Sequence, residues 1–205
     1  MAPSSSAFTV AIAPGFRDPV FQSQATFRAV LDALAEPGSE RAVTGIAEAP
    51  VPLSPVAAAV IATLADFETA VWRDTALRTP EIEAWLAFHT GAPVALDPTR
   101  AHFAAIGAAE ICPDFSDFAL GTDVDPSTSA TLILQVAGFA TGRRFRLAGP
   151  GIDGTRDVTI AGAPDDLAER LAANHALFPR GVDLILAGPT SVMGLPRTTR
   201  IEEIR

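Results

Sequence analysis

Apolar residues recur at helical spacing in four stretches of the chain, and each stretch follows residues that start helices. Asp18-Pro19 precedes the first, which Pro37-Gly38 ends. Ser54-Pro55 begins a second that runs to about residue 66, Thr79-Pro80 begins a third that ends near residue 91, and residues 163–166 begin a fourth. Aspartate, serine and threonine accept hydrogen bonds from the free amides of the first turn, and proline fits the first helical position. The pattern therefore predicts four helices.

Between these helices lie five segments that read as strands, at residues 69–73, 102–106, 131–137, 144–148 and 182–187. The third and fifth are nearly continuous apolar runs, which is typical of strands buried on both faces of a covered sheet. The fourth alternates arginine with apolar residues, so one of its faces meets solvent. The order of elements predicts an α/β fold with a mixed sheet between layers of helices.

The amino-acid composition narrows the classes of partner and the location that fit this chain. The chain has 205 residues, of which 48% are hydrophobic and 19% charged, so it forms a globular core. Its net charge of −9 disfavours nucleic acid and anionic membranes. The start of the chain lacks the pattern of a secretory signal, and the longest apolar run, residues 56–65, is about half a membrane span. We expect a cytoplasmic protein.

All 15 basic residues are arginine. A chain that lacks lysine cannot form a Schiff base with pyridoxal phosphate, and it cannot supply the lysine of a phosphate-binding loop. We therefore expect no cofactor.

Two loops resemble ligand motifs but lack essential parts. Residues 149–154 read G-x-G-x-x-G, yet the β-branched and broken sequence that follows does not predict the helix that a dinucleotide site requires, so we expect a turn. Residues 123–128 resemble the start of a calcium loop, but Thr128 and Leu134 replace its glycine and its closing acid. The three histidines have no helical ligand spacing. The sequence predicts no metal site and no catalytic residue.

A few side chains remain as candidates for binding. Cys112 lacks an activating base nearby in sequence and is expected to be packed. His89 is expected to bond the last carbonyls of its helix, with a role in ligand or partner binding as the alternative. Arginines 143, 144 and 146 are expected to form surface salt bridges. Arg197, Thr198 and Thr199 combine a guanidinium with hydroxyls, which suits a phosphate or phosphonate, and a structural role is an equal alternative.

Several segments, in order, resemble the H subunit of the carbon–phosphorus lyase system. The resemblance covers about residues 15–200. It is carried by Gly15-Phe16-x-Asp18-Pro19-Val20, Phe88-His89-Thr90-Gly91-Ala92-Pro93, Ala130-Thr131-Leu132-Ile133-Leu134-Gln135-Val136, Phe178-Pro179-x-Gly181-Val182-Asp183-Leu184 and Leu195-Pro196-Arg197-Thr198-Thr199.

This resemblance implies a three-layer α/β/α sandwich like a reduced pyridoxal-phosphate-dependent transferase without the cofactor. It implies residues 15–205 as one domain. Residues 1–14 fall outside the match, and their small and polar composition with two prolines predicts a flexible arm. It also implies a homodimer that joins the G, I and J subunits, and that with the G, I and L subunits supports transfer of an alkylphosphonate onto the ribose of ATP.

We expect no activity from the chain alone. The alternative is a self-sufficient small enzyme acting on a phosphorylated or phosphonate substrate, which would need a base, nucleophile or metal in one pocket. A subunit that assembles with others must expose apolar surface, and Phe16, Phe21, Phe115 and Phe118 are the expected contributors.

Overall fold

A six-stranded sheet forms the centre of the molecule in a computed structural model that describes residues 12–204. Its strand order is β1-β8-β7-β4-β3-β2, in which β2, β3, β4 and β7 run parallel and β8 is antiparallel to both of its neighbours. These strands are β1 (Glu40–Ala42), β2 (Val71–Arg73), β3 (Phe103–Ile106), β4 (Thr131–Gln135), β7 (Asp183–Ala187) and β8 (Ser191–Leu195). A second, antiparallel sheet has the order β6-β5-β9 and contains β5 (Gly138–Ala148), β6 (Arg156–Ala161) and β9 (Arg200–Ile204).

The predicted helices are present with the predicted starts. They are α1 (Pro19–Ala35), α2 (Pro55–Leu64), α3 (Pro80–Thr90) and α4 (Leu167–His175). The side chains of Asp18, Ser54 and Thr79 each accept a hydrogen bond from a first-turn amide, as expected of N-caps. Gly91 ends α3 in the left-handed conformation, with φ of 67°. Among the residues described, no helix is both long and apolar enough to cross a membrane.

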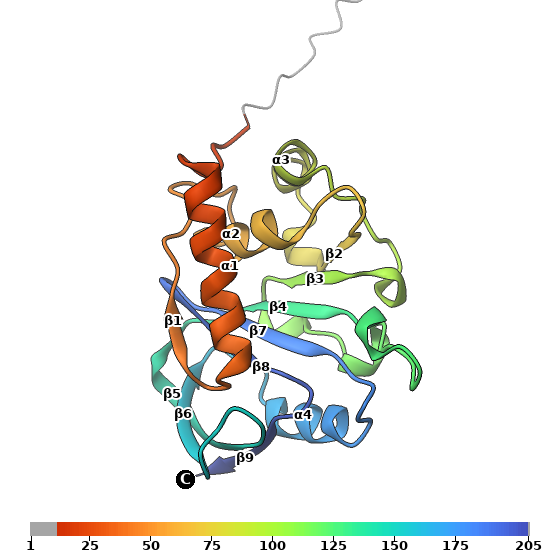
Figure 1. The fold of residues 1–205 in the computed structure, drawn as a ribbon. Coiled ribbons are helices and arrows are strands. Elements are labelled where there is room, and N and C mark those ends of the chain that lie inside the picture. Colours follow the sequence, from red (N-terminus) through yellow and green to blue (C-terminus); the bar gives the residue numbers. More distant parts are fainter. Residues whose placement is uncertain (1–11, 205) are drawn as a thin grey trace, which may run out of the picture.

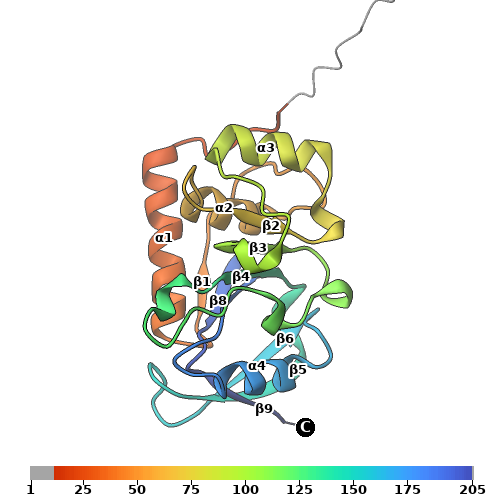
Figure 2. The same cartoon turned by 90° about the vertical axis from the view of Figure 1, so that its right-hand side faces the viewer.

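The central sheet separates two hydrophobic cores, because successive side chains of a strand point to opposite faces. Ile133 and Ile185 join α1, α2 and α3 on one side. Leu132 and Leu184 join β5, β6 and α4 on the other. In Figure 1, α1 crosses the strands of the sheet, and α4 lies beside β9. Figure 2 shows α3 and α4 at opposite ends of the molecule.

The expected α/β fold with a mixed sheet is confirmed, and the two layers that cover the sheet differ from each other. Helices form one layer, while the other combines α4 with the three-stranded sheet. Four of the five predicted strands lie within the expected segments. The strand expected at residues 144–148 is β5, which begins earlier, at Gly138, and β1, β6, β8 and β9 were not predicted.

The G-x-G-x-x-G segment is the turn from β5 to β6, as expected. Its glycine at position 151 has φ of 80°, and a Cβ atom there would lie 2.1 Å from the Ala35 carbonyl oxygen. That glycine lets the turn pack against the end of α1.

Candidate functional site

Arg197 lies in the turn between β8 and β9, where it ties three segments together. Its Nε atom is 3.1 Å from Asp183 Oδ1, and Nη2 bonds to Asp183 Oδ2 and to the Ser129 hydroxyl. Nη1 donates to the Pro126 carbonyl at 2.9 Å, and the backbone amide of Arg197 also donates to Asp183. All three guanidinium nitrogens therefore donate within the chain, which makes Arg197 a residue that positions its neighbours.

A shallow cavity of about 350 Å³ opens beside this arginine. Arg197 and Thr198 line it together with Phe178, Pro179 and Asp183. Thr199 is buried, and its hydroxyl has no hydrogen-bond partner among the described residues. The structure thus brings Arg197 and Thr198 to one cavity and places Thr199 in the interior.

We expected His89 to bond the last carbonyls of α3, and this expectation is wrong. Its Nε2 atom lies 3.0 Å from the Ala13 carbonyl oxygen, and its ring packs on Trp85 at 4.7 Å between centroids. A Cβ atom at position 15 would lie 2.7 Å from Nδ1 of the same ring. His89 therefore holds residues 13–15 against α3. The predicted arm at residues 1–14 lies mostly outside the described residues, and Ala13 itself is half-buried on the core.

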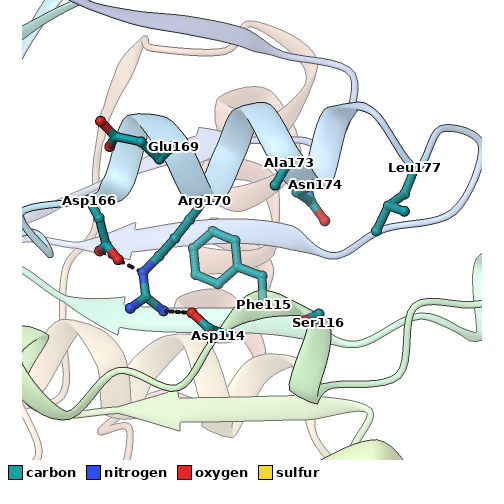
Figure 3. A pocket seen from close by; sticks show the side chains of 9 residues that line it. All are labelled: Asp114, Phe115, Ser116, Asp166, Glu169, Arg170, Ala173, Asn174 and Leu177. Atoms are coloured by element: carbon teal, nitrogen blue, oxygen red, sulfur yellow. Dashed lines mark hydrogen bonds and ion pairs between the residues drawn. The ribbon is translucent and has the colours of Figure 1, made fainter.

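A larger cavity of about 440 Å³ lies between α4 and the single turn η4 (Phe115–Asp117), and the sequence did not point to it (Figure 3). Arg170 reaches from α4 toward η4, with Nε 2.6 Å from Asp166 and Nη1 3.1 Å from Asp114. Nη1 also bonds to the carbonyls of Cys112 and Pro113. The hydrogen bond from Arg170 lowers the pKa of Asp166, so this carboxylate stays ionised. The ion pairs and hydrogen bonds of Arg170 therefore form one wall of this cavity.

Cys112 lies just behind this network and is packed, as expected. Burial raises the pKa of its thiol to about 11, which keeps the sulfur protonated and unreactive at neutral pH.

The arginine cluster on β5 forms salt bridges, as expected. Arg143 pairs with Glu203, and Arg146 pairs with Asp157 at 2.8 Å. The hydrogen bond from Arg146 lowers the pKa of Asp157. In the loop that resembles a calcium site, the carboxylate of Asp125 accepts from the Ser127 amide. Within the described part of the chain, no group of three or more acidic, histidine or cysteine side chains could hold a metal.

The prediction of four exposed phenylalanines is partly wrong. Phe115 and Phe118 are core residues that are 4% and 2% exposed, and Phe118 packs edge-on against Trp72. Phe21 is 70% exposed, as expected, and Phe16 is half-buried. An unpredicted stripe of exposed apolar residues follows α1 at helical spacing: Val20, Phe27 and Leu31.

Comparison with known proteins assigns the chain to a family. A family model described as bacterial phosphonate metabolism protein (PhnH) matches residues 14–202. In Rhizobium meliloti (strain 1021), alpha-D-ribose 1-methylphosphonate 5-triphosphate synthase subunit PhnH is 40% identical over 187 residues, covering 91% of this chain and 94% of that protein. A Stutzerimonas stutzeri protein described as a candidate C–P lyase subunit, HtxG, is 38% identical over 82 residues, covering 40% of this chain and 42% of that protein. The chain belongs to the PhnH family of bacterial phosphonate metabolism proteins, which confirms the resemblance seen in the sequence.

Proposed function

We propose that this chain is a subunit of the complex that makes alpha-D-ribose 1-methylphosphonate 5-triphosphate, and that it contributes binding surface to that complex. The observation that carries the proposal is its 40% identity to the Rhizobium meliloti synthase subunit over 91% of the chain. In this role it supports attachment of an alkylphosphonate to the ribose of ATP, with adenine as the leaving group.

The side chains agree with a supporting role. The guanidinium groups of Arg197 and Arg170 are engaged within the chain, and the Cys112 thiol is buried and protonated. The exposed stripe of Val20, Phe27 and Leu31 supports contact with another chain, because monomeric proteins rarely expose large contiguous patches of apolar side chains. Specific interfaces bury about 800 Å² per partner, and such a stripe supplies the apolar centre.

The detailed assembly remains part of the proposal. We infer a homodimer in the cytoplasm that joins the G, I and J subunits, with the L subunit taking part in the synthase reaction. The J subunit then performs the radical cleavage of the carbon–phosphorus bond. We also infer that residues 15–205 form one domain, related to a reduced pyridoxal-phosphate-dependent transferase that has lost its cofactor. In this arrangement Arg197 and Thr198 shape a surface for a partner or an anion, and the buried Thr199 supports the turn beneath it.

Reconstitution tests the proposal. Purified chain is mixed with the G, I and L subunits, ATP and methylphosphonate, and adenine release and the ribosyl phosphonate product are measured by chromatography. We expect product from the full mixture, a sharp loss when this chain is omitted, and no turnover by the chain alone. Undiminished product in its absence contradicts the proposal.

A second candidate is a self-sufficient enzyme acting on a phosphorylated or phosphonate substrate. The cavity between α4 and η4 favours it, because a space of about 440 Å³ lined by Asp114, Asp166 and Arg170 can hold a small molecule. Turnover of ATP or methylphosphonate by the purified chain alone would select this candidate over the subunit role.

A further inference from the structure

The fold covers one face of α1 and leaves an apolar face of the same helix in contact with solvent. Val30 and Ala33 face the core beneath the helix. Val20, Phe27 and Leu31 lie on the outer face and are 72%, 51% and 52% exposed. Figure 2 shows α1 along one edge of the molecule, with the other helices and the sheet on one side of it. The outer face of α1 is therefore free to meet another chain.

The spacing of these exposed residues indicates the shape of partner that fits them. Gln24 lies between Val20 and Phe27, so the steps along the stripe to Leu31 are four, three and four residues. Alternating steps of three and four residues are typical of a helix that packs its side chains into the holes of a second helix. The stripe extends for about 17 Å, which is three helical turns. The backbone groups of α1 are bonded within the helix, so side chains make the contact and a helix is the matching shape.

Two arginines accompany this stripe. Arg17 comes just before α1 and Arg28 follows Phe27, and both are exposed. Within the described part of the chain, neither side chain forms a hydrogen bond or an ion pair. Arg28 borders the stripe directly, because it is four residues after Gln24 and three before Leu31. The charges available at the border of the stripe are therefore positive, in a chain whose net charge is −9.

We propose that the outer face of α1 docks a helix of a partner subunit, and that this helix carries an apolar stripe bordered by carboxylates. The apolar side chains of the two helices interdigitate, and the partner's carboxylates pair with Arg28 and Arg17. A second copy of this chain fits less well, because it would bring the same arginines to the same face. The inference rests on the proposed role as a subunit, and it names the surface and the partner chemistry through which that role is performed.

Binding measurements test the surface. The unmodified chain and its variants are each titrated with the G, I and J subunits, and the dissociation constants are compared after circular dichroism has shown that every variant is folded. Leu31→Ser should weaken binding roughly tenfold or more, because it removes an apolar contact from the centre of the interface. Arg28→Gln should weaken it about two- to fivefold and make it less sensitive to added salt, because the border charges are partly screened. The control is Val124→Ser, which alters a 96% exposed residue before β4 and should bind as the unmodified chain does.

Photo-crosslinking then identifies the occupant. Benzoylphenylalanine in place of Gln24 should crosslink to a partner subunit in the assembled complex, and mass spectrometry should locate the crosslink in an amphipathic helical sequence with aspartate or glutamate beside its apolar residues. The same group in place of Val124 should not give this crosslink. A crosslink to a second copy of the chain, or to a segment without acidic residues, overturns the proposal.

The outcomes also separate this inference from the proposed function. If the unmodified chain binds none of the subunits, both are overturned. If it binds them and Leu31→Ser binds with unchanged affinity, the subunit role stands and the docking surface on α1 is wrong.

Discussion

Replacing Arg197 with alanine should destabilise the fold, because this side chain closes a network between three distant segments. The substitution removes the donors that satisfy Asp183, the Ser129 hydroxyl and the Pro126 carbonyl. The side chains of Arg197 and Asp183 are 13% and 25% exposed, so solvent screens their attraction only in part. The backbone amide at position 197 still reaches Asp183 after the change.

The expected loss follows from these contacts. Breaking a buried ion pair by removing one partner costs about 3–5 kcal/mol, and a hydrogen bond to a charged group contributes about 1.5–3 kcal/mol. Because Asp183 stays partly solvated and keeps one amide donor, we expect Arg197→Ala to lower the free energy of unfolding by about 3 kcal/mol. The matched control is Arg200→Ala, which removes an exposed arginine three residues later and should change it by less than about 0.5 kcal/mol.

The assay is urea unfolding followed by circular dichroism and by fluorescence of Trp72 and Trp85, both of which are buried. The double variant Arg197→Ala/Asp183→Ala should lose less than the sum of the two single losses, since each single change leaves a partner uncompensated. A loss below about 1 kcal/mol for Arg197→Ala, or strict additivity in the double variant, would refute this reasoning.

Three further outcomes are expected. Asp74→Ala should lower the free energy of unfolding by about 2–4 kcal/mol, because the buried Leu77 amide and the partly buried Gly107 amide lose their carboxylate acceptor. Asp97→Ala at an exposed cap should cost about 1 kcal/mol or less, and equal losses in urea titrations would contradict this. Folded Cys112 should react with Ellman's reagent at pH 8 on the order of 200-fold more slowly than the unfolded chain, because a pKa of about 11 leaves little thiolate until the pH approaches that value; a fast native reaction at pH 8 contradicts the burial. Phe27→Ser should reduce co-purification with the partner subunits while the free energy of unfolding changes by less than about 0.5 kcal/mol, and Phe67→Ser, which alters a more exposed phenylalanine outside α1, should leave assembly intact; the reverse pattern would contradict a docking surface on α1.

The sequence predicted the elements whose signals are local. Capping residues such as Ser54 and Thr79 marked helix starts, and the apolar runs of β4 and β7 marked strands in the centre of the sheet. In contrast, β1 and β9 become strands by pairing with β8 and β5, which are distant in the sequence, and their short sequences carry no comparable periodicity. The prediction of these strands was limited by the long sequence separation between paired strands, and not by their short length alone.

The site residues follow the same division. Phe115 and Phe118 lie outside the predicted helices and strands and were expected on the surface, whereas α4 and Trp72 cover these rings in three dimensions. Arg73, at the end of β2, is buried beside residues of α3 and of the segment after it, so no local sequence pattern could reveal its burial. Arg197 was predicted as a candidate for binding an anion or a partner, but the hydrogen bonds that engage its guanidinium became visible only once Asp183 and Ser129 were placed beside it.

The pairing of β1 with β8 has a consequence for how the protein is made. Glu40 lies opposite Met193, and Ala33 of α1 packs against Gly194, so the edge of the sheet joins segments about 150 residues apart in synthesis. At 5–20 residues per second, α1 and β1 leave the ribosome roughly 7–30 s before β8 exists to receive them. During that interval Ala33 and Val30, which later face the core, are uncovered on the same helix as Phe27. A nascent helix that is apolar on two sides is a substrate for chaperones, so production in a foreign host should depend on chaperone capacity more than on the final stability of the fold.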